Sequence, residues 1–205
     1  MSRALLAAAV LAVTGLWLTG CASVPHNPHN LCDVFTEKRS WYRAAKRAAD
    51  RWGGPVHVPL AMMYQESGFK ANAKPPRRWF LGFIPLGRVS SAYGYPQALK
   101  GTWALYQYEA GSRFSDRDNF ADAIDFMFWY MDKTHRLNGI SKWDAKNQYL
   151  SYHEGHGGYA RGTYSDKPWL LQVAARVDAR AAAYAAQFNG CRQRLDRNWF
   201  MRLFL

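Results

Sequence analysis

Apolar residues recur at helical spacing where the chain first shows a sustained pattern. From Thr36 onward, apolar side chains return every three or four positions as far as Trp52, and the pair Gly53-Gly54 follows them. Because residues three and four apart lie on one face of an α-helix, the pattern predicts an amphipathic helix that the glycines end. The apolar positions are Trp41, Ala44, Ala45, Ala48 and Trp52.

Further helices are predicted along the chain. One begins at Val58-Pro59, with Pro in its first turn, and runs to Glu66. The others are a short helix at 102–108, a long one from Phe120 to Asn138-Gly139, one over 143–152 that the glycines of "GHGGY" interrupt, and an Ala-rich one over 168–188 that ends at Asn189-Gly190. The sequence has no convincing strand pattern and no internal repeat, so the predicted fold is mainly α.

The segment 74–88, "KPPRRWFLGFIPLGR", breaks this helical pattern. It is rich in Pro and Gly, mixes Arg with Trp and Phe, and has no sustained period. It predicts a loop or lid, for which two roles remain open. Its Arg and Trp side chains could clamp an anionic peptide stem or a glycan, or its aromatic side chains could pack on the domain.

The chain opens with a segment typical of secretion signals. Arg3 precedes an almost wholly apolar run from Ala4 to Leu18, and small residues follow. The run is short for a membrane span, so residues 1–20 are expected to be a signal peptide. Its end, "LTGC", resembles the lipobox of bacterial lipoproteins, in which the cysteine, here Cys21, is lipidated and becomes the new N-terminus. The alternative is cleavage elsewhere, with Cys21 incidental.

The residues after Cys21 indicate a tether and a location in the cell envelope. "ASVPHNPHN" at 22–30 is rich in Pro and Asn without periodicity, so 21–35 is expected to be the lipidated N-terminus and its tether. The Asp that commonly retains such lipoproteins at the inner membrane is absent, since Ala22 occupies its position. In a Gram-negative host, the resemblance therefore implies anchoring to the outer membrane, facing the periplasm.

Two further cysteines, Cys32 and Cys191, flank almost the whole mature chain. In an oxidising compartment a disulfide between them is favoured, and closing so long a loop contributes about 4 to 5 kcal/mol in the chain-entropy model. Two unpaired thiols are the alternative.

The net charge of +12 and pI of about 9.8 indicate an anionic partner. Basic charge alone is also typical of nucleic-acid binding, but the cell envelope offers peptidoglycan carboxylates and membrane phosphates instead. We therefore expect association with the cell wall and no nucleic-acid partner. Charge that serves only solubility is the alternative.

Three separated motifs resemble, in order and rough spacing, the lytic transglycosylases of the soluble type. They are "ESGF" at 66–69, "SAYGYPQALKGTW" at 91–103 and "SYHEGHGGY" at 151–159. The family pattern is Glu-Ser followed closely by an aromatic, then Gly-Ala-x-Gly-Leu-Met-Gln with a Thr five residues after the Gln, then Ala-Tyr-Asn-x-Gly. The matching residues are Glu66, Ser67, Phe69, Ala92, Gly94, Gln97, Thr102, Tyr152 and Gly155.

The chain departs from that pattern at several positions. Ser91 stands where the family usually has Gly, Tyr95-Pro96 replace Leu-Met, and His153 replaces the Asn after the tyrosine. The loop between the first two motifs is also unusually long. These departures concern substrate subsites more than the reaction.

The resemblance implies a goose-lysozyme-like helical domain over 36–190, followed by a C-terminal tail at 191–205. Family members cleave the β-1,4 bond between N-acetylmuramic acid and N-acetylglucosamine in peptidoglycan and leave 1,6-anhydro ends. By the resemblance, Glu66 is the single general acid/base, Gln97 helps hold the sugar and Tyr152 hydrogen-bonds near the acid. Ser67 is also expected at the substrate site. No metal and no organic cofactor are implied.

The residues around Glu66 support its role independently. An acid that protonates a glycosidic oxygen needs a raised pKa, and Met62, Met63, Tyr64 and Phe69 provide apolar neighbours in sequence. Ordinary glycosidases need a second carboxylate. A transglycosylase does not, because the 6-hydroxyl of the muramic acid attacks C1 within the same molecule.

Glu154 leaves the reaction outcome open. If its side chain faces the cleft, it could bind substrate or activate water, which would make the enzyme a lysozyme-type muramidase. If not, Glu154 is a solvent-facing loop residue. The histidines of "HEGH", His153 and His156, lie three apart with a glycine between them, which does not fit the zinc motif with histidines four apart. Outside enzymes, the alternative is a peptidoglycan-binding lipoprotein that has lost turnover.

Overall fold

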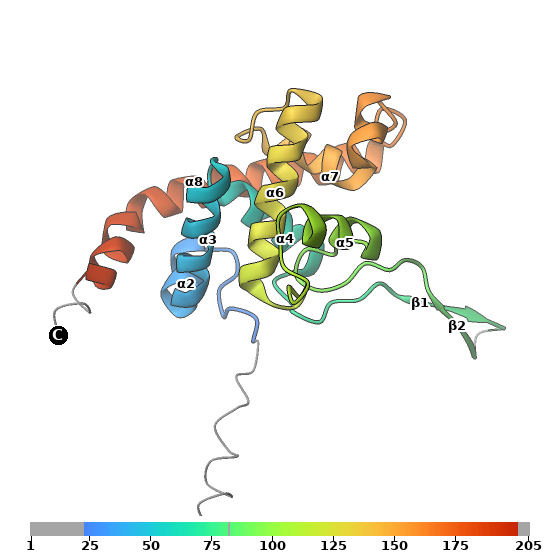
Figure 1. Cartoon of the computed structure of the whole chain (residues 1–205), viewed down its shortest axis with the longest axis horizontal. Helices are drawn as coiled ribbons and strands as arrows, with labels where there is room; N and C mark the ends of the chain where they lie inside the picture. The colour runs from blue at the N-terminus through green and yellow to red at the C-terminus, as the bar shows by residue number, and fades with distance from the viewer. Residues whose placement is uncertain (1–22, 82, 201–205) are drawn as a thin grey trace, which may run out of the picture.

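The computed structural model describes residues 23–81 and 83–200, and its architecture is mainly α, as predicted (Figure 1). The predicted signal peptide 1–20, the predicted lipidation site Cys21 and the end of the predicted tail, 201–205, lie outside the described residues. The helices are α2 Leu31–Glu37, α3 Arg39–Trp52, α4 His57–Ser67, α5 Lys100–Glu109, α6 Phe120–Asn138, α7 Ala145–Ala160 and α8 Pro168–Phe200.

The interior of the domain is built around α4 and α6. In α4, every residue from Val58 to Met63 is buried, and α6 is buried on most of its surface from Phe120 to Met131. A helix that is apolar on nearly all sides must be enclosed by other elements. Accordingly α4 packs on α6, α7 and α8, while α6 also packs on α3 and α5. Glu66, in the last turn of α4, therefore emerges directly from the core.

The long central helix has the ends that the sequence predicts. The Asn119 side chain accepts hydrogen bonds from the backbone N–H groups of Ala121 and Asp122 and so caps the first turn. Gly139 follows the last turn in the left-handed conformation, with φ +68°. The predicted span from Phe120 to Asn138-Gly139 is confirmed.

The helical domain begins earlier than residue 36. The predicted helix from Thr36 is two helices, α2 and α3, which meet at Lys38, and α2 starts at Leu31 within the predicted tether. Asn30 caps α2 through its side chain, and the apolar side chains of Leu31, Val34 and Phe35 are fully buried. These residues are too few for a sustained period, so their helical character depends on packing against the rest of the domain.

The N-terminal helix is fastened to α8. Cys32 and Cys191 form a disulfide, with an S–S distance of 2.11 Å and a Cα–Cα distance of 6.0 Å, so the predicted bridge is present. Beside it, the Gln187 side chain accepts from the Leu31 N–H at 2.8 Å and donates to the His29 carbonyl at 3.2 Å. The start of the domain is thus held covalently and by hydrogen bonds to its last helix.

Helix α8 continues through Asn189-Gly190, where the sequence predicts an end, so that boundary is wrong. Beyond Gly190, Cys191 and Leu195 are almost fully buried, and Asp196 accepts hydrogen bonds from Tyr42 and Lys46 of α3. These tertiary contacts outweigh the local preference of Asn and Gly for a helix end. The predicted tail is therefore helical as far as residue 200.

The predicted loop at 74–88 contains a short antiparallel hairpin, which the sequence analysis missed. Strands β1 Arg77–Phe80 and β2 Ile84–Arg88 pair with Arg77 opposite Arg88 and Phe80 opposite Ile84. In Figure 1 the hairpin extends away from the helical body. None of the helices in the described part of the chain is long and apolar enough to span a membrane.

Candidate active site

The chain turns back sharply just after Glu66. Helix α4 ends at Ser67, and both Gly68 (φ 59°) and Phe69 (φ 62°) adopt the left-handed conformation. Glycine accepts this conformation readily, whereas Phe69 is held in it by complete burial of its side chain against Trp41 and Tyr64. The turn fixes the end of α4 and with it the position of Glu66.

The Glu66 carboxyl group sits in a largely desolvated environment. Burial raises its pKa from the ordinary 4.5 to about 7, because a carboxylate loses its hydration there. A hydrogen bond from the hydroxyl of Tyr149, a buried residue of α7, opposes part of this rise. Glu66 is therefore substantially protonated up to neutral pH, the state required of a general acid.

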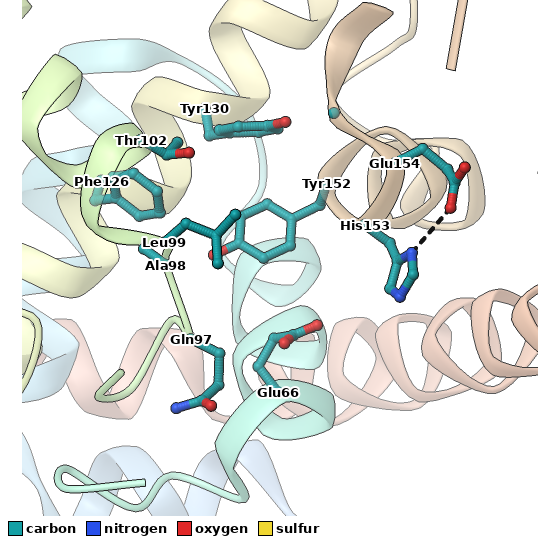
Figure 2. Close-up of a pocket in the computed structure, with 11 residues that line it drawn as sticks. Glu66, Gln97, Ala98, Leu99, Thr102, Phe126, Tyr130, Tyr152, His153 and Glu154 are labelled. Carbon is teal, nitrogen blue, oxygen red and sulfur yellow. Dashed lines mark hydrogen bonds and ion pairs between the residues drawn. The ribbon is translucent and has the colours of Figure 1, made fainter. Parts of the chain in front are cut away.

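Glu66 opens into a cavity of about 360 Å³. Its walls come from the end of α4, the loop before α5, the middle of α6 and the kinked part of α7 (Figure 2). The lining residues are Glu66, Gln97, Ala98, Leu99, Thr102, Phe126, Tyr130, Tyr152, His153, Glu154 and Gly155. Of the four residues predicted to contact substrate, Gln97, Tyr152 and Glu154 are thus brought together with the candidate acid.

Gln97 is held rigidly at the wall of the cavity. Its backbone is left-handed (φ 50°), and its amide nitrogen donates to the carbonyls of Ala73 at 2.9 Å and Gly94 at 2.8 Å. With the amide nitrogen engaged by the backbone, the amide oxygen is the group that remains to accept a hydrogen bond from a ligand.

Tyr152 is fixed by a hydrogen bond to the backbone and by packing of its ring. Its hydroxyl donates to the Pro96 carbonyl at 2.5 Å, and its ring packs edge-on against Tyr130 at 4.9 Å. Burial and the charge of Glu66 raise the pKa of Tyr152 well above its ordinary value, so the hydroxyl stays protonated. The tyrosine that hydrogen-bonds Glu66 is Tyr149, three residues earlier on α7, which the sequence analysis missed. Its helical spacing from Tyr152 was the available signal.

Glu154 lines the cavity, but its carboxylate is engaged elsewhere. It accepts from Lys167 Nζ at 2.7 and 2.8 Å, from the Thr163 hydroxyl, and contacts His153 Nδ1 at 3.0 Å. Chiefly through the Lys167 and Thr163 hydrogen bonds, its pKa falls to about 2. The Glu154 side chain is only 5% exposed and belongs to α7, so the interpretation as a solvent-facing loop residue is wrong. In Figure 2 it points away from Glu66.

The glycine break predicted in "GHGGY" is present at Gly155. This residue has φ 73° and ψ 158° inside α7, a conformation that interrupts the helix before it resumes toward Ala160. Because the kink follows directly after Tyr152, His153 and Glu154, it sets the directions in which these three side chains leave the helix. A Cβ at Gly155 would meet no atom within 4 Å, so the backbone conformation itself calls for glycine here.

Comparison with known proteins agrees with this geometry. The family described as "Transglycosylase SLT domain" matches residues 9–191, which is most of the chain. The chain belongs to the SLT transglycosylase family. No curated protein and no solved structure matches it. The resemblance drawn from the three motifs is thereby confirmed, and membership makes the protein, in general terms, a lytic transglycosylase acting on peptidoglycan.

Ser67 does not join the cavity of this SLT transglycosylase. It is buried, and its hydroxyl donates to the Met63 carbonyl at 3.1 Å within α4. A serine that bonds to the carbonyl four residues earlier satisfies its own helix end. Ser67 therefore supports the turn that carries Glu66. It does not line the cavity, where a substrate contact was expected.

The two histidines of the third motif have separate partners in this SLT transglycosylase. His153 contacts Glu154 and packs edge-on to Trp169 at 5.2 Å, whereas His156 bonds Thr134 at 3.1 Å and stacks on Tyr130. Within residues 23–81 and 83–200, no group of three His, Cys, Asp or Glu side chains is arranged to hold a metal ion.

Proposed function

We propose that the protein cleaves the β-1,4 bond between N-acetylmuramic acid and N-acetylglucosamine and leaves a 1,6-anhydro end on the muramic acid. The observation that carries the proposal is the Glu66 carboxyl group, whose pKa is raised to about 7 by burial at the wall of the cavity. A carboxyl with this pKa can give up a proton and take one back near neutral pH.

In the proposed reaction Glu66 acts twice. Protonated Glu66 first gives its proton to the glycosidic oxygen, and the bond from that oxygen to C1 of the muramic acid breaks. The Glu66 carboxylate then takes the proton of the sugar's own 6-hydroxyl, whose oxygen forms the new bond to C1. Because nucleophile and C1 belong to one sugar, the attack needs little further positioning by the protein.

The cavity offers matching groups for a sugar. The Gln97 amide oxygen can accept from an N-acetyl N–H or a hydroxyl, and the side chains of Leu99, Phe126 and Tyr130 provide apolar surface for the ring and acetyl group. We expect these side chains to contact a segment of a peptidoglycan glycan strand. The proposed chemistry needs no cofactor.

The state of Glu154 supports this outcome over hydrolysis. A muramidase needs a second carboxylate to act as nucleophile or to activate water. Glu154 instead accepts hydrogen bonds from Lys167 and Thr163 and contacts His153, and its low pKa makes it a weak base. Glu66 is then the carboxyl group in the cavity that is available for the reaction.

A pair of matched substitutions tests the mechanism. Glu66→Gln should abolish release of muropeptides from purified peptidoglycan while the helical circular dichroism stays unchanged. Glu154→Gln should release muropeptides more slowly but still with anhydro ends, identified by mass spectrometry. Reducing ends from the wild type would establish the muramidase alternative, with Glu154 then essential.

Zymography separates an enzyme from a wall-binding protein that lacks turnover. Wild-type protein should clear a gel that contains peptidoglycan, and the Glu66→Gln variant should not. A gel left intact by refolded wild type would favour the binding protein.

We also propose that Cys21 is lipidated and anchors the protein to the periplasmic face of the outer membrane. The sequence supports this through the apolar run that ends in "LTGC" and through Ala22 after the cysteine. Metabolic labelling with a palmitate analogue should mark the wild type and leave Cys21→Ala unlabelled. Recovery of the labelled wild type in the inner-membrane fraction would overturn the outer-membrane assignment.

A further inference from the structure

The hairpin formed by β1 and β2 is the least supported element of the fold. Its two strands contact each other, and neither has extensive contacts with a helix in the described part of the chain. An isolated two-stranded hairpin is only marginally stable in water and usually needs a surface to cover one face.

The end of the hairpin exposes large apolar side chains. Leu81, Phe83 and Leu86, which we call the hairpin tip, are 69%, 70% and 59% exposed. Single exposed apolar residues are common on protein surfaces, but here three fall within six residues of one projecting element. In Figure 1 the hairpin that carries these residues points away from the helical body.

The strands behind the tip carry unopposed positive charge. Arg77 and Arg88 are exposed and lie opposite each other in the ladder, an arrangement of like charges that destabilises a sheet. Neither takes part in an ion pair among the described residues, although Arg88 donates to the Pro75 carbonyl at 2.5 Å.

The same charge bias extends through the surrounding sequence. No Asp or Glu stands between Glu66 and Glu109. The Lys and Arg residues of that segment are Lys70, Lys74, Arg77, Arg78, Arg88 and Lys100. The partner of the hairpin should therefore be anionic where it meets the strands and apolar where it meets the tip.

A lipid bilayer with anionic headgroups fits both requirements. Its phosphates can pair with Arg77 and Arg88, and its acyl chains can cover the hairpin tip. A glycan strand offers carboxylates but no apolar interior for Leu81 and Leu86. A second copy of the chain would bring the same cations together. We propose that the hairpin inserts its tip into an anionic membrane surface and so gives the domain a contact with lipid separate from the N-terminus.

A fluorescent label at the tip tests the insertion directly. The full chain, carrying Cys21→Ser and Phe83→Cys, is labelled at position 83 with an environment-sensitive thiol dye, since Cys32 and Cys191 are bonded to each other. Dye emission should rise with vesicles of phosphatidylglycerol and phosphatidylcholine and stay low with phosphatidylcholine alone. The same label on Phe114→Cys, which is 77% exposed outside the hairpin, should not respond.

Charge and position variants complete the test. In the labelled chain, Arg77→Gln and Arg88→Gln should each raise the lipid concentration needed for half of the emission change by about fivefold. Leu86→Cys, labelled in place of position 83, should respond as position 83 does. Equal responses at positions 83 and 114, or a response to soluble glycan strands and none to vesicles, would overturn the proposal.

This inference is independent of the chemistry proposed for Glu66. Leu81→Ser with Phe83→Ser should leave cleavage of solubilised glycan strands unchanged while vesicle binding by the hairpin is lost. Glu66→Gln should leave the dye response at position 83 unchanged. Each proposal can therefore fail without the other.

Discussion

Glu66 and Glu154 line one cavity, yet their surroundings shift their pKa values in opposite directions. Glu66 loses hydration at the end of a buried helix and gains only the Tyr149 hydroxyl in exchange. Glu154 gains Lys167 and Thr163, which stabilise its charged form. Groups that differ in this way take different roles in a reaction, here the proton donor and a structural anion.

The raised pKa of Glu66 predicts how activity depends on pH. Because the first step needs protonated Glu66, the turnover number should fall as pH rises through about 7. Tyr149→Phe removes the hydrogen bond that lowers the Glu66 pKa, so this decline should move to higher pH. Tyr159→Phe, on the same helix but outside the cavity lining, is the control and should keep the wild-type profile. An unmoved profile in Tyr149→Phe would contradict the role assigned to Tyr149.

The lowered pKa of Glu154 predicts an acid-dependent contribution to stability. Since its pKa falls to about 2 on folding, the folded state is favoured by its charge above the ordinary pKa of 4.5, and this contribution is lost as pH drops toward 2. Glu154→Gln should lower the free energy of unfolding by about 1 kcal/mol at pH 7. Urea unfolding at several pH values should show the difference from wild type vanishing in acid; a constant difference would argue against the ion pair.

At the scale of elements, local signals predict helix ends well where capping residues alone decide them. The pair Asn138-Gly139 ends α6 as expected, and Gly155 interrupts α7. At Asn189-Gly190 the same signal failed, because the disulfide and buried residues beyond it hold α8 together. The hairpin at 77–88 was missed, since its strands are short and lack alternation.

The loop that carries Gln97 depends on one glycine. Gly94 has φ +77°, and a Cβ there would lie 2.1 Å from the Arg117 carbonyl oxygen. Gly94→Ala should therefore lower the free energy of unfolding by about 2 to 4 kcal/mol and displace the Gln97 side chain, with loss of activity.

Gly101→Ala is the matched control for this substitution. Gly101 lies in α5, and a Cβ there would meet nothing within 4 Å. The variant should be as stable as the wild type or up to about 0.5 kcal/mol more stable, measured by urea unfolding. Equal stability of both alanine variants would show that the Gly94 contact is relaxed in solution.

At the scale of the whole molecule, the sequence was sufficient to predict the family and to predict that Glu66, Gln97 and Tyr152 meet at one site. Their motifs lie far apart along the chain, and only a shared fold explains their order. It was insufficient for the partners of each side chain. The Tyr149 contact, the Lys167 pair of Glu154 and the burial of Ser67 all depend on helix packing, which spacing along the chain does not specify.

The disulfide between α2 and α8 should contribute strongly to stability. Cys32 and Cys191 are 159 residues apart, so the bridge restricts the unfolded chain over most of its length. Replacing both with Ser should lower the free energy of unfolding by about 5 kcal/mol in the chain-entropy model, measured by urea unfolding. Wild type treated with a reductant should match the double variant; a difference below about 1 kcal/mol would show that packing alone holds the two helices together.

The contact between α2 and α8 also has a consequence for how the protein is made. Leu31, Val34 and Phe35 of α2 leave the ribosome early, but α8, which carries Gln187 and Cys191, is synthesised much later. Native packing of α2 must therefore wait until residue 191 has been synthesised, and its apolar face stays uncovered for that time. A chain that stops before residue 191 cannot form the bridge between α2 and α8, so truncated molecules should remain accessible to proteases.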